Sequence, residues 1–204
     1  MLIAGLTGSI ATGKSTVSAI LKDLGAFIVD ADLAAREVVL PGMPAWDEIV
    51  RIFGRDILQV TGEIHRERLG ALVFNDAKMR AMLEAVVHPE VMRVMDEQIS
   101  TIRAGSSDAV VILDVPLLIE TGMHRGVSEV IVVYCPEDQQ MRRLMVRDRI
   151  GRDEALARIR AQLSIEEKRR HASLIIDNST TVDNTRRQVQ DVFATLREKA
   201  SGLD

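Results

Sequence analysis

Short apolar runs and helical patterns alternate from the start of the chain. Leu2 to Leu6 is an apolar run that leads into a polar, glycine-containing loop, and Thr16 to Leu24 then carries apolar side chains at helical spacing. Gly25 is typical of a helix C-terminus. Ala26 to Val29 forms a second apolar run, which stops at Asp30. This pattern predicts a strand, a helix and a second strand, which together make one βαβ unit.

The rest of the chain continues the alternation. Three further apolar runs predict strands at Val110 to Leu113, Val130 to Val133 and Leu174 to Ile176. Helical spacing predicts helices from about 33 to 40, over 66–103, 137–162 and 165–170, and over 182–200. Pro89 should either begin a new helix or kink the one around it, because proline removes a backbone donor and clashes with the preceding turn.

Five short strands alternating with helices predict an α/β fold with a parallel, five-stranded sheet in three layers, since parallel strands need crossover connections. We expect the second strand to lie beside the first. Ligands of such sheets gather at the carboxyl ends of the strands. Residues 33 to 108 form the longest insertion between strands and are the candidate for a smaller subdomain.

Composition excludes several classes of protein. At 204 residues, with 47% hydrophobic and 27% charged residues, the chain has the balance of a globular protein. The net charge of −4 argues against a general nucleic-acid binder. The apolar runs are too short to cross a membrane, and Met1 to Ser9 lacks a basic region typical of a signal peptide, so we expect a cytoplasmic protein. The single cysteine, Cys135, is expected to be buried.

The strongest chemical signal is the segment Gly8-Ser9-Ile10-Ala11-Thr12-Gly13-Lys14-Ser15, which fits the phosphate-loop (P-loop) pattern G-x-x-x-x-G-K-S/T between a strand and a helix. Its backbone N–H groups are expected to bind the phosphates of ATP. Lys14 should reach the β- and γ-phosphates, and the Ser15 hydroxyl should bind Mg²⁺. The predicted phosphate contacts are Ser9, Ile10, Ala11, Thr12, Gly13, Lys14, Ser15 and Thr16.

A P-loop also occurs in nucleotide-dependent switches, which are the alternative class. The chain lacks the Asn-Lys-x-Asp segment of GTPases, and its only Asp-x-x-Gly, Asp148 to Gly151, falls in a predicted helix. A kinase instead needs a carboxylate near the γ-phosphate to orient the acceptor hydroxyl. Asp32, which follows the second strand, is the predicted base, and Asp30 is expected to cap the helix that follows.

The segment from Glu137 to Arg170 is rich in arginine and carries one lysine, Lys168, and most of these side chains are expected on a solvated face. A lid over the phosphates would need some arginines to stabilise transition-state charge. Arg143 and Arg147, one helical turn apart, should face one phosphate group. Asp114, which ends a buried strand, either supports Mg²⁺ or only caps a turn.

The order of these motifs resembles the dephospho-CoA kinase family over nearly the whole chain. The segments that carry the resemblance are LTGSIATGKSTV, VDADLAAREVV, VVHPEV, VILDVPLLIETG, YCPEDQQMRRLMVRD, IRAQLSIEEK and LIIDNS. The resemblance implies an ATP-dependent phosphotransferase that phosphorylates the ribose 3′-hydroxyl of dephospho-CoA, giving coenzyme A and ADP, with Mg²⁺ as cofactor and no obligate protein partner. Adenylate-kinase-like and shikimate-kinase-like patterns fit less well, because Ser15 follows Lys14 where the first has glycine and no Gly-Gly pair occurs.

The resemblance also implies roles for residues. Asp32 would be the acceptor-hydroxyl base, Lys14 and Ser15 would serve ATP and Mg²⁺, and Arg143 would stabilise the transferred phosphoryl group. Further substrate-binding candidates are His88, Pro116, Leu117, Leu118 and Arg147. For His88, a structural hydrogen bond at a helix junction is an equally open interpretation.

The implied division is a core (about 1–58, 106–137 and 171–204), a helical acceptor-binding subdomain (about 59–105) and a lid (about 138–170). One departure is visible, because the family commonly reads Gly-Gly-Ile-Gly-Ser-Gly-Lys where this chain has Ser9 and Ala11. A side chain at these positions should disturb a left-handed backbone or crowd the phosphates, at a cost in affinity rather than in function.

Overall fold

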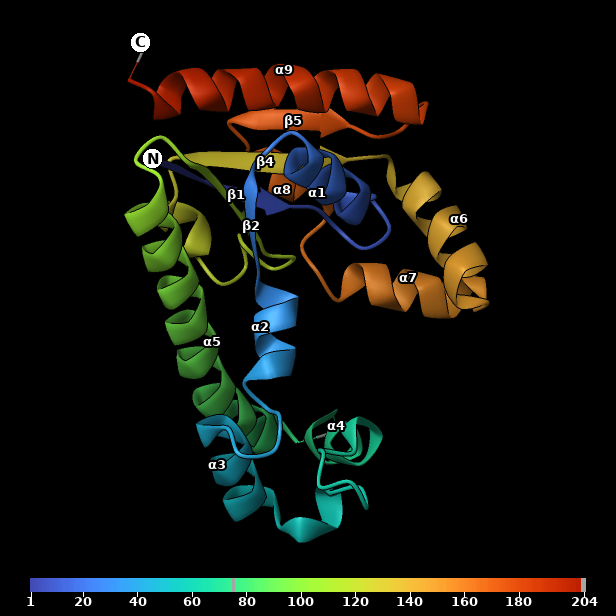
Figure 1. Ribbon diagram of the computed structural model, residues 1–204. Coiled ribbons are helices and arrows are strands. Elements are labelled where there is room, and N and C mark those ends of the chain that lie inside the picture. The colour runs from blue at the N-terminus through green and yellow to red at the C-terminus, as the bar shows by residue number, and fades with distance from the viewer. Residues whose placement is uncertain (75, 203–204) are drawn as a thin grey trace. The chain divides into compact units, whose positions relative to one another are not determined.

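The structure, a computed structural model, describes residues 1–74 and 76–202 (Figure 1). It divides into two compact units, which we call unit 1 (Met1–Val29 with Ile102–Asp204) and unit 2 (Asp30–Thr101). The predicted acceptor-binding range includes Asn75 and the predicted core includes residues 203–204, and these positions lie outside the described residues. The second unit thus begins earlier than the predicted subdomain, and the finer division into core, subdomain and lid stays a prediction.

The five predicted strands form one sheet. They are β1 (Leu2–Thr7), β2 (Phe27–Asp30), β3 (Val110–Asp114), β4 (Glu129–Tyr134) and β5 (Leu174–Asp177), in the order β2-β3-β1-β4-β5. Parallel registers set Leu6 beside Asp114 and Tyr134 beside Asp177, so the carboxyl ends of these strands share one edge. The predicted parallel α/β fold is therefore confirmed.

The expectation that β2 lies beside β1 was wrong, because β3 stands between them. All five residues of β3 are buried, as an interior strand requires, whereas only Val29 of β2 is buried, which suits the sheet's edge. Apolar patterning gives the sequence of strands along the chain but not their lateral order.

Two helices cover one face of the sheet. They are α1 (Lys14–Asp23) and α9 (Val182–Ala200), and Figure 1 shows α9 running along β5. Alternate strand residues such as Leu6 and Ile131 join Leu21 and Leu196 in a buried core. On the opposite face, α8 (Ile165–Arg169) contacts β4. These layers hold the strand ends, and the loops that follow them, in fixed positions.

The predicted single helix over 137–162 is two helices, α6 (Glu137–Asp148) and α7 (Arg152–Arg160), which pack on each other (Figure 1). Arg149 ends α6 in the left-handed conformation, with a φ of 56°, and Gly151 caps the start of α7. The Asp-x-x-Gly segment therefore lies at this turn rather than inside a helix. Leu144, Ala155 and Ile159 form the buried contact of the pair.

Unit 2 is helical. It contains α2 (Ala31–Glu37), α3 (Pro44–Phe53), the short 3₁₀ helix η1 (Arg55–Ile57), α4 (Arg66–Phe74) and most of α5 (Ala77–Gly105). Ile49, Ile57, Ile64 and Leu69 form its core, with Trp46 packed against them. Trp46 also donates a hydrogen bond to the Gly62 carbonyl at 3.0 Å, which agrees with a structural role.

Helix α5 continues through Pro89, which excludes the first of the two alternatives, a new helix beginning there, and His88 does not lie at a helix junction. Pro89 is exposed, as is Ala85, whose carbonyl loses its helical partner to the proline. Water can therefore satisfy that carbonyl. No helix of residues 1–74 and 76–202 combines the length and the apolar character needed to cross a membrane.

Candidate active site

The P-loop joins β1 to α1, and two of its glycines are required by their surroundings. Gly13 has a φ of 91°, and a Cβ atom there would lie 2.1 Å from Asn178 Nδ2. A Cβ at Gly8 would lie 2.5 Å from Thr12 Oγ1 and 2.9 Å from the Val133 carbonyl oxygen. Because neither position has room for a side chain, the loop keeps the close turn that an anion-binding backbone needs.

Asn178, directly after β5, anchors the loop. Its Nδ2 donates to the Thr12 carbonyl at 2.8 Å, and its Oδ1 accepts from Thr185 Oγ1, on α9, at 2.8 Å. Asn178, Thr12 and Thr185 are all buried, so these bonds are shielded from water. The sequence singled out Ile176-Asp177-Asn178 as a motif but assigned Asn178 no task.

The two non-glycine positions of the loop differ from each other. Ala11 takes the left-handed conformation, with a φ of 62°, whereas Ser9 is not among the described non-glycine residues of positive φ. Ser9 is buried, and its hydroxyl donates to the Leu163 carbonyl at 3.2 Å. The backbone strain expected at these positions is therefore confined to Ala11.

Ala11→Gly should raise the free energy of unfolding by about 1 kcal/mol, because glycine adopts a positive φ without the steric cost that alanine bears. Urea denaturation measures this change. Ala157→Gly is the matched control: Ala157 is exposed within α7, so the same exchange there should lower the free energy of unfolding by about 1 kcal/mol. Two changes of the same sign would contradict the strain at Ala11.

Lys14, in the first turn of α1, forms an ion pair with Asp114 Oδ1. Asp114 is only 3% exposed, and its register beside Leu6 brings it next to the strand that leads into the P-loop. The ion pair with Lys14 is a contact of Asp114 that neither of its two predicted roles, metal support and turn capping, includes. Ser15 and Thr16 are exposed in the first turn of α1.

The two predicted arginines have different partners. Arg143 Nη2 donates to the Asn178 carbonyl at 2.8 Å, which links Arg143 to the residue that anchors the P-loop. The Arg147 side chain is 57% exposed and pairs with Asp148 at 2.7 Å, and the hydrogen bond to Asp148 raises the Arg147 pKa. Of these two arginines, Arg143 is thus the one that is connected to the P-loop, through Asn178, in the described part of the chain.

The loop after β3 holds the three predicted acceptor-site residues. The Pro116 carbonyl accepts hydrogen bonds from Thr7 Oγ1 at 2.9 Å and from Lys168 Nζ at 2.7 Å. Leu118 is fully buried against Gly5, where an added Cβ would lie 2.5 Å from its side chain. Leu117 is 41% exposed, so it is the side chain of this trio that faces outward.

Lys168 is an exception to the solvated face expected for most of the charged residues of 137–170, since it is fully buried. Its Nζ donates to the Pro116 carbonyl and pairs with Glu120 Oε1 at 3.0 Å, which compensates part of the cost of burial. Burial lowers the Lys168 pKa, and the hydrogen bond to Glu120 acts against that shift. Lys168 is the single lysine of residues 137–170, but the charged pattern around it does not predict that it is buried while Arg169 and Arg170 are exposed.

Cys135 is buried, as expected, with its Sγ 4.0 Å from the Ala11 carbonyl oxygen. Burial raises the pKa of its thiol, so the thiol stays protonated at neutral pH and is a poor nucleophile. Cys135 is therefore a packing residue beneath the P-loop.

Three of the residues singled out from the sequence, Asp30, Asp32 and His88, belong to unit 2. Asp30 Oδ1 accepts from the Asp32 and Leu33 backbone N–H groups at 2.8 Å and 3.0 Å, which confirms its predicted role as the cap of α2. Asp32 lies in the first turn of that helix, and His88 is exposed on α5.

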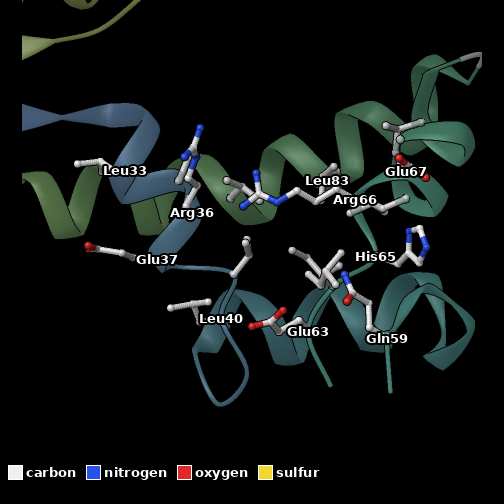
Figure 2. Close-up of a pocket in the computed structure, with 18 residues that line it drawn as sticks. Leu33, Arg36, Glu37, Leu40, Gln59, Glu63, His65, Arg66, Glu67 and Leu83 are labelled. Carbon is white, nitrogen blue, oxygen red and sulfur yellow. The ribbon is translucent and has the colours of Figure 1, made fainter. Parts of the chain in front are cut away.

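Unit 2 also holds a pocket of about 930 Å³ (Figure 2). Apolar side chains, among them Leu40, Leu69 and Leu83, alternate in its lining with charged ones. Figure 2 shows Arg36, from α2, and Arg66, from α4, on the same side of the pocket. Three glutamates also line the pocket, so its charged lining carries both signs beside the apolar side chains, which suits a ligand with an apolar and a polar part.

Comparison with known proteins gives a consistent result. A family model described as dephospho-CoA kinase matches residues 2–184. A dephospho-CoA kinase of Carboxydothermus hydrogenoformans is 46% identical over 191 residues, which is 94% of this chain and 92% of that protein. The crystal structure of TT1252 from Thermus thermophilus is similar with a TM-score of 0.82 and 36% identity, covering 96% of this chain and 97% of that one. A dephospho-CoA kinase from Campylobacter jejuni has a TM-score of 0.73 and 29% identity, covering 99% and 98%.

Proposed function

This chain belongs to the dephospho-CoA kinase family, and from that premise we propose how its residues perform the reaction. The activity is transfer of the γ-phosphoryl group of ATP to the ribose 3′-hydroxyl of dephospho-CoA, which gives coenzyme A and ADP. The single observation that supports the residue roles best is the glycine-enforced P-loop, anchored by Asn178 and carrying Lys14 at the start of α1.

The ATP phosphates are held by the P-loop from Ser9 to Thr16. Its N–H groups and the N-terminal end of α1 attract the anion. Lys14 exchanges its ion pair with Asp114 for the β- and γ-phosphates, and Arg143 moves from the Asn178 carbonyl to the transferred phosphoryl group. Each of these two cations thus has a protein partner that carries less negative charge than ATP, and ATP replaces that partner when it binds.

Magnesium fits the oxygen donors beside Lys14. The Ser15 hydroxyl and the Asp114 carboxylate are hard ligands of the kind that Mg²⁺ prefers, and these two residues would hold the ion. When bound, the ion neutralises charge on the β- and γ-phosphate oxygens. We also propose that the protein works in the cytoplasm.

Asp32 accepts the proton of the 3′-hydroxyl.

The pocket of unit 2 holds part of dephospho-CoA. Arg36 and Arg66 suit the phosphate groups of this substrate, and the apolar lining suits its uncharged pantetheine arm. His88, Pro116, Leu117, Leu118 and Arg147 stay candidates for further acceptor contacts.

The reaction is tested by ADP release from ATP and Mg²⁺ in a coupled assay, with dephospho-CoA, AMP, shikimate or no acceptor. We expect rapid ADP release when dephospho-CoA is the acceptor, and not with AMP, with shikimate or without an acceptor. Turnover with another acceptor would reject the acceptor assignment, and equal release without any acceptor would favour a nucleotide-dependent switch.

Arg66→Ala should raise the KM for dephospho-CoA roughly tenfold or more, because a charge-assisted hydrogen bond to phosphate contributes about 1.5–3 kcal/mol. The KM for ATP should stay within about twofold, since that substrate occupies the P-loop. Arg68→Ala is the control, because Arg68 is on the same helix and its guanidinium donates instead to the Asp56 carbonyl. Equal effects of both changes on dephospho-CoA would contradict the pocket's role.

A further inference from the structure

The turn between α7 and α8, residues 162–164, lies against the P-loop. Gln162 Oε1 accepts from the Ile10 backbone N–H at 3.1 Å, and the Leu163 carbonyl accepts from Ser9 Oγ at 3.2 Å. One backbone donor and one hydroxyl of the phosphate loop are therefore bonded to a segment that is 152 and 154 positions away in sequence.

The same turn is tied to the loop after β3. The Leu163 N–H donates to Glu120 Oε1 at 3.1 Å, and that oxygen also pairs with Lys168 Nζ at 3.0 Å. Lys168 donates to the Pro116 carbonyl, which accepts from Thr7 as well. Thr7 directly precedes the P-loop. This series of hydrogen bonds therefore connects Ser9 and Ile10, through the turn and the loop after β3, to the residue before Gly8.

Stability alone does not explain the two central residues. Lys168 is fully buried and bears a desolvation cost that an apolar side chain of similar length would avoid. Gln162 has an uncharged amide side chain, and Ala161 and Leu163 on either side of it are uncharged as well. An amide can accept from the Ile10 N–H without placing a negative charge beside ATP, which a carboxylate would do.

We propose that Gln162 and Lys168 are positioning residues for phosphoryl transfer. Gln162 fixes the first turn of the P-loop, so that the following N–H groups point at the phosphates, and Lys168 holds Glu120, Leu163 and Pro116 behind it. The proposal rests on the P-loop being the ATP site. Replacing either residue should therefore lower kcat more than it weakens ADP binding, because misplaced N–H groups stabilise the transition state less well.

The test compares Gln162→Ala, Gln162→Glu and the control Gln190→Ala, an exposed residue of α9. Calorimetric titration gives ATP and ADP binding without an acceptor, and the coupled assay gives kcat. Gln162→Ala should lower kcat roughly tenfold or more with a melting temperature within about 2 °C of wild type. Gln162→Glu keeps the bond to Ile10 but should weaken ATP binding more than ADP binding, because ATP carries more negative charge.

Three results would overturn the proposal. Gln162→Ala with unchanged kcat and tighter ATP binding would make Gln162 only a competitor for the Ile10 N–H. Gln162→Ala indistinguishable from Gln190→Ala would remove its role. A wild-type chain that does not bind ATP would reject the ATP site together with this inference, and the wild-type titration alone detects that case.

Lys168 needs a second design, because Lys168→Met leaves the Glu120 carboxylate without its cation. The double change Lys168→Met with Glu120→Gln removes that charge and keeps an acceptor for the Leu163 N–H. It should restore the melting temperature to within about 4 °C of wild type while kcat stays lowered roughly tenfold. Recovery of kcat along with stability would show that Lys168 is only structural.

Discussion

Lys14→Met should lower kcat/KM for ATP by roughly 10³-fold, which is one of the two largest effects expected at a single position. Loss of one preorganised donor to developing charge costs about 10²–10³-fold, and Lys14 also supplies a full positive charge. The change leaves Asp114, which is 3% exposed, without its cation. The free energy of unfolding should therefore fall by about 3 kcal/mol as well.

The two consequences are separated by adding Asp114→Asn, which removes the unpaired charge. The double variant should recover most of the lost stability in urea denaturation, but not activity in the coupled assay. Lys22→Met, an exposed change in the last turn of the same helix, serves as the control and should leave both quantities unchanged. Turnover by Lys14→Met within about tenfold of wild type would contradict a γ-phosphate role.

Asp32→Asn should lower kcat by roughly 10²–10⁴-fold, the range that general-base catalysis contributes, while ATP binding stays near wild type. Asparagine keeps the shape of the side chain but cannot accept the hydroxyl proton. Single-turnover kinetics and calorimetric titration of ATP measure the two effects separately.

Asp30→Asn is the matched control, because asparagine caps a helix about as well as aspartate and should preserve the bonds to the Asp32 and Leu33 N–H groups. Its kcat should be close to that of wild type. If Asp30→Asn lost turnover and Asp32→Asn kept it, the roles assigned to the two carboxylates would have to be exchanged.

Much of this fold follows from local pattern. The β-branched run from Val110 and the helix from Val182 to Ala200 were predicted because each carries its own periodicity. Features that depend on distant partners were not predicted. The break at Arg149 rests on one backbone angle within a strongly helical composition, and the place of β3 between β2 and β1 is decided by burial across the sheet.

The candidate site shows the same division. The P-loop is a contiguous motif with fixed spacing, so the sequence identified it directly, although the atoms that leave no room for a side chain at Gly13 belong to the distant Asn178. Lys168 donates a hydrogen bond to Pro116, which is 52 positions away, and Gln162 accepts one from Ile10, which is 152 positions away. Both residue types are also common on exposed helices, so the sequence did not mark them. Asn178 lies between: its motif was visible, but its hydrogen bond to Thr12 was not.

That hydrogen bond also sets an order of events while the ribosome makes the protein. Thr12 and Asn178 are 166 positions apart, and Thr185 follows later still. At ordinary elongation rates the phosphate loop therefore waits on the order of ten seconds for its anchor. A nascent chain stalled before residue 178 should accordingly lack the ordered loop and bind no nucleotide, however well its first βαβ unit has formed.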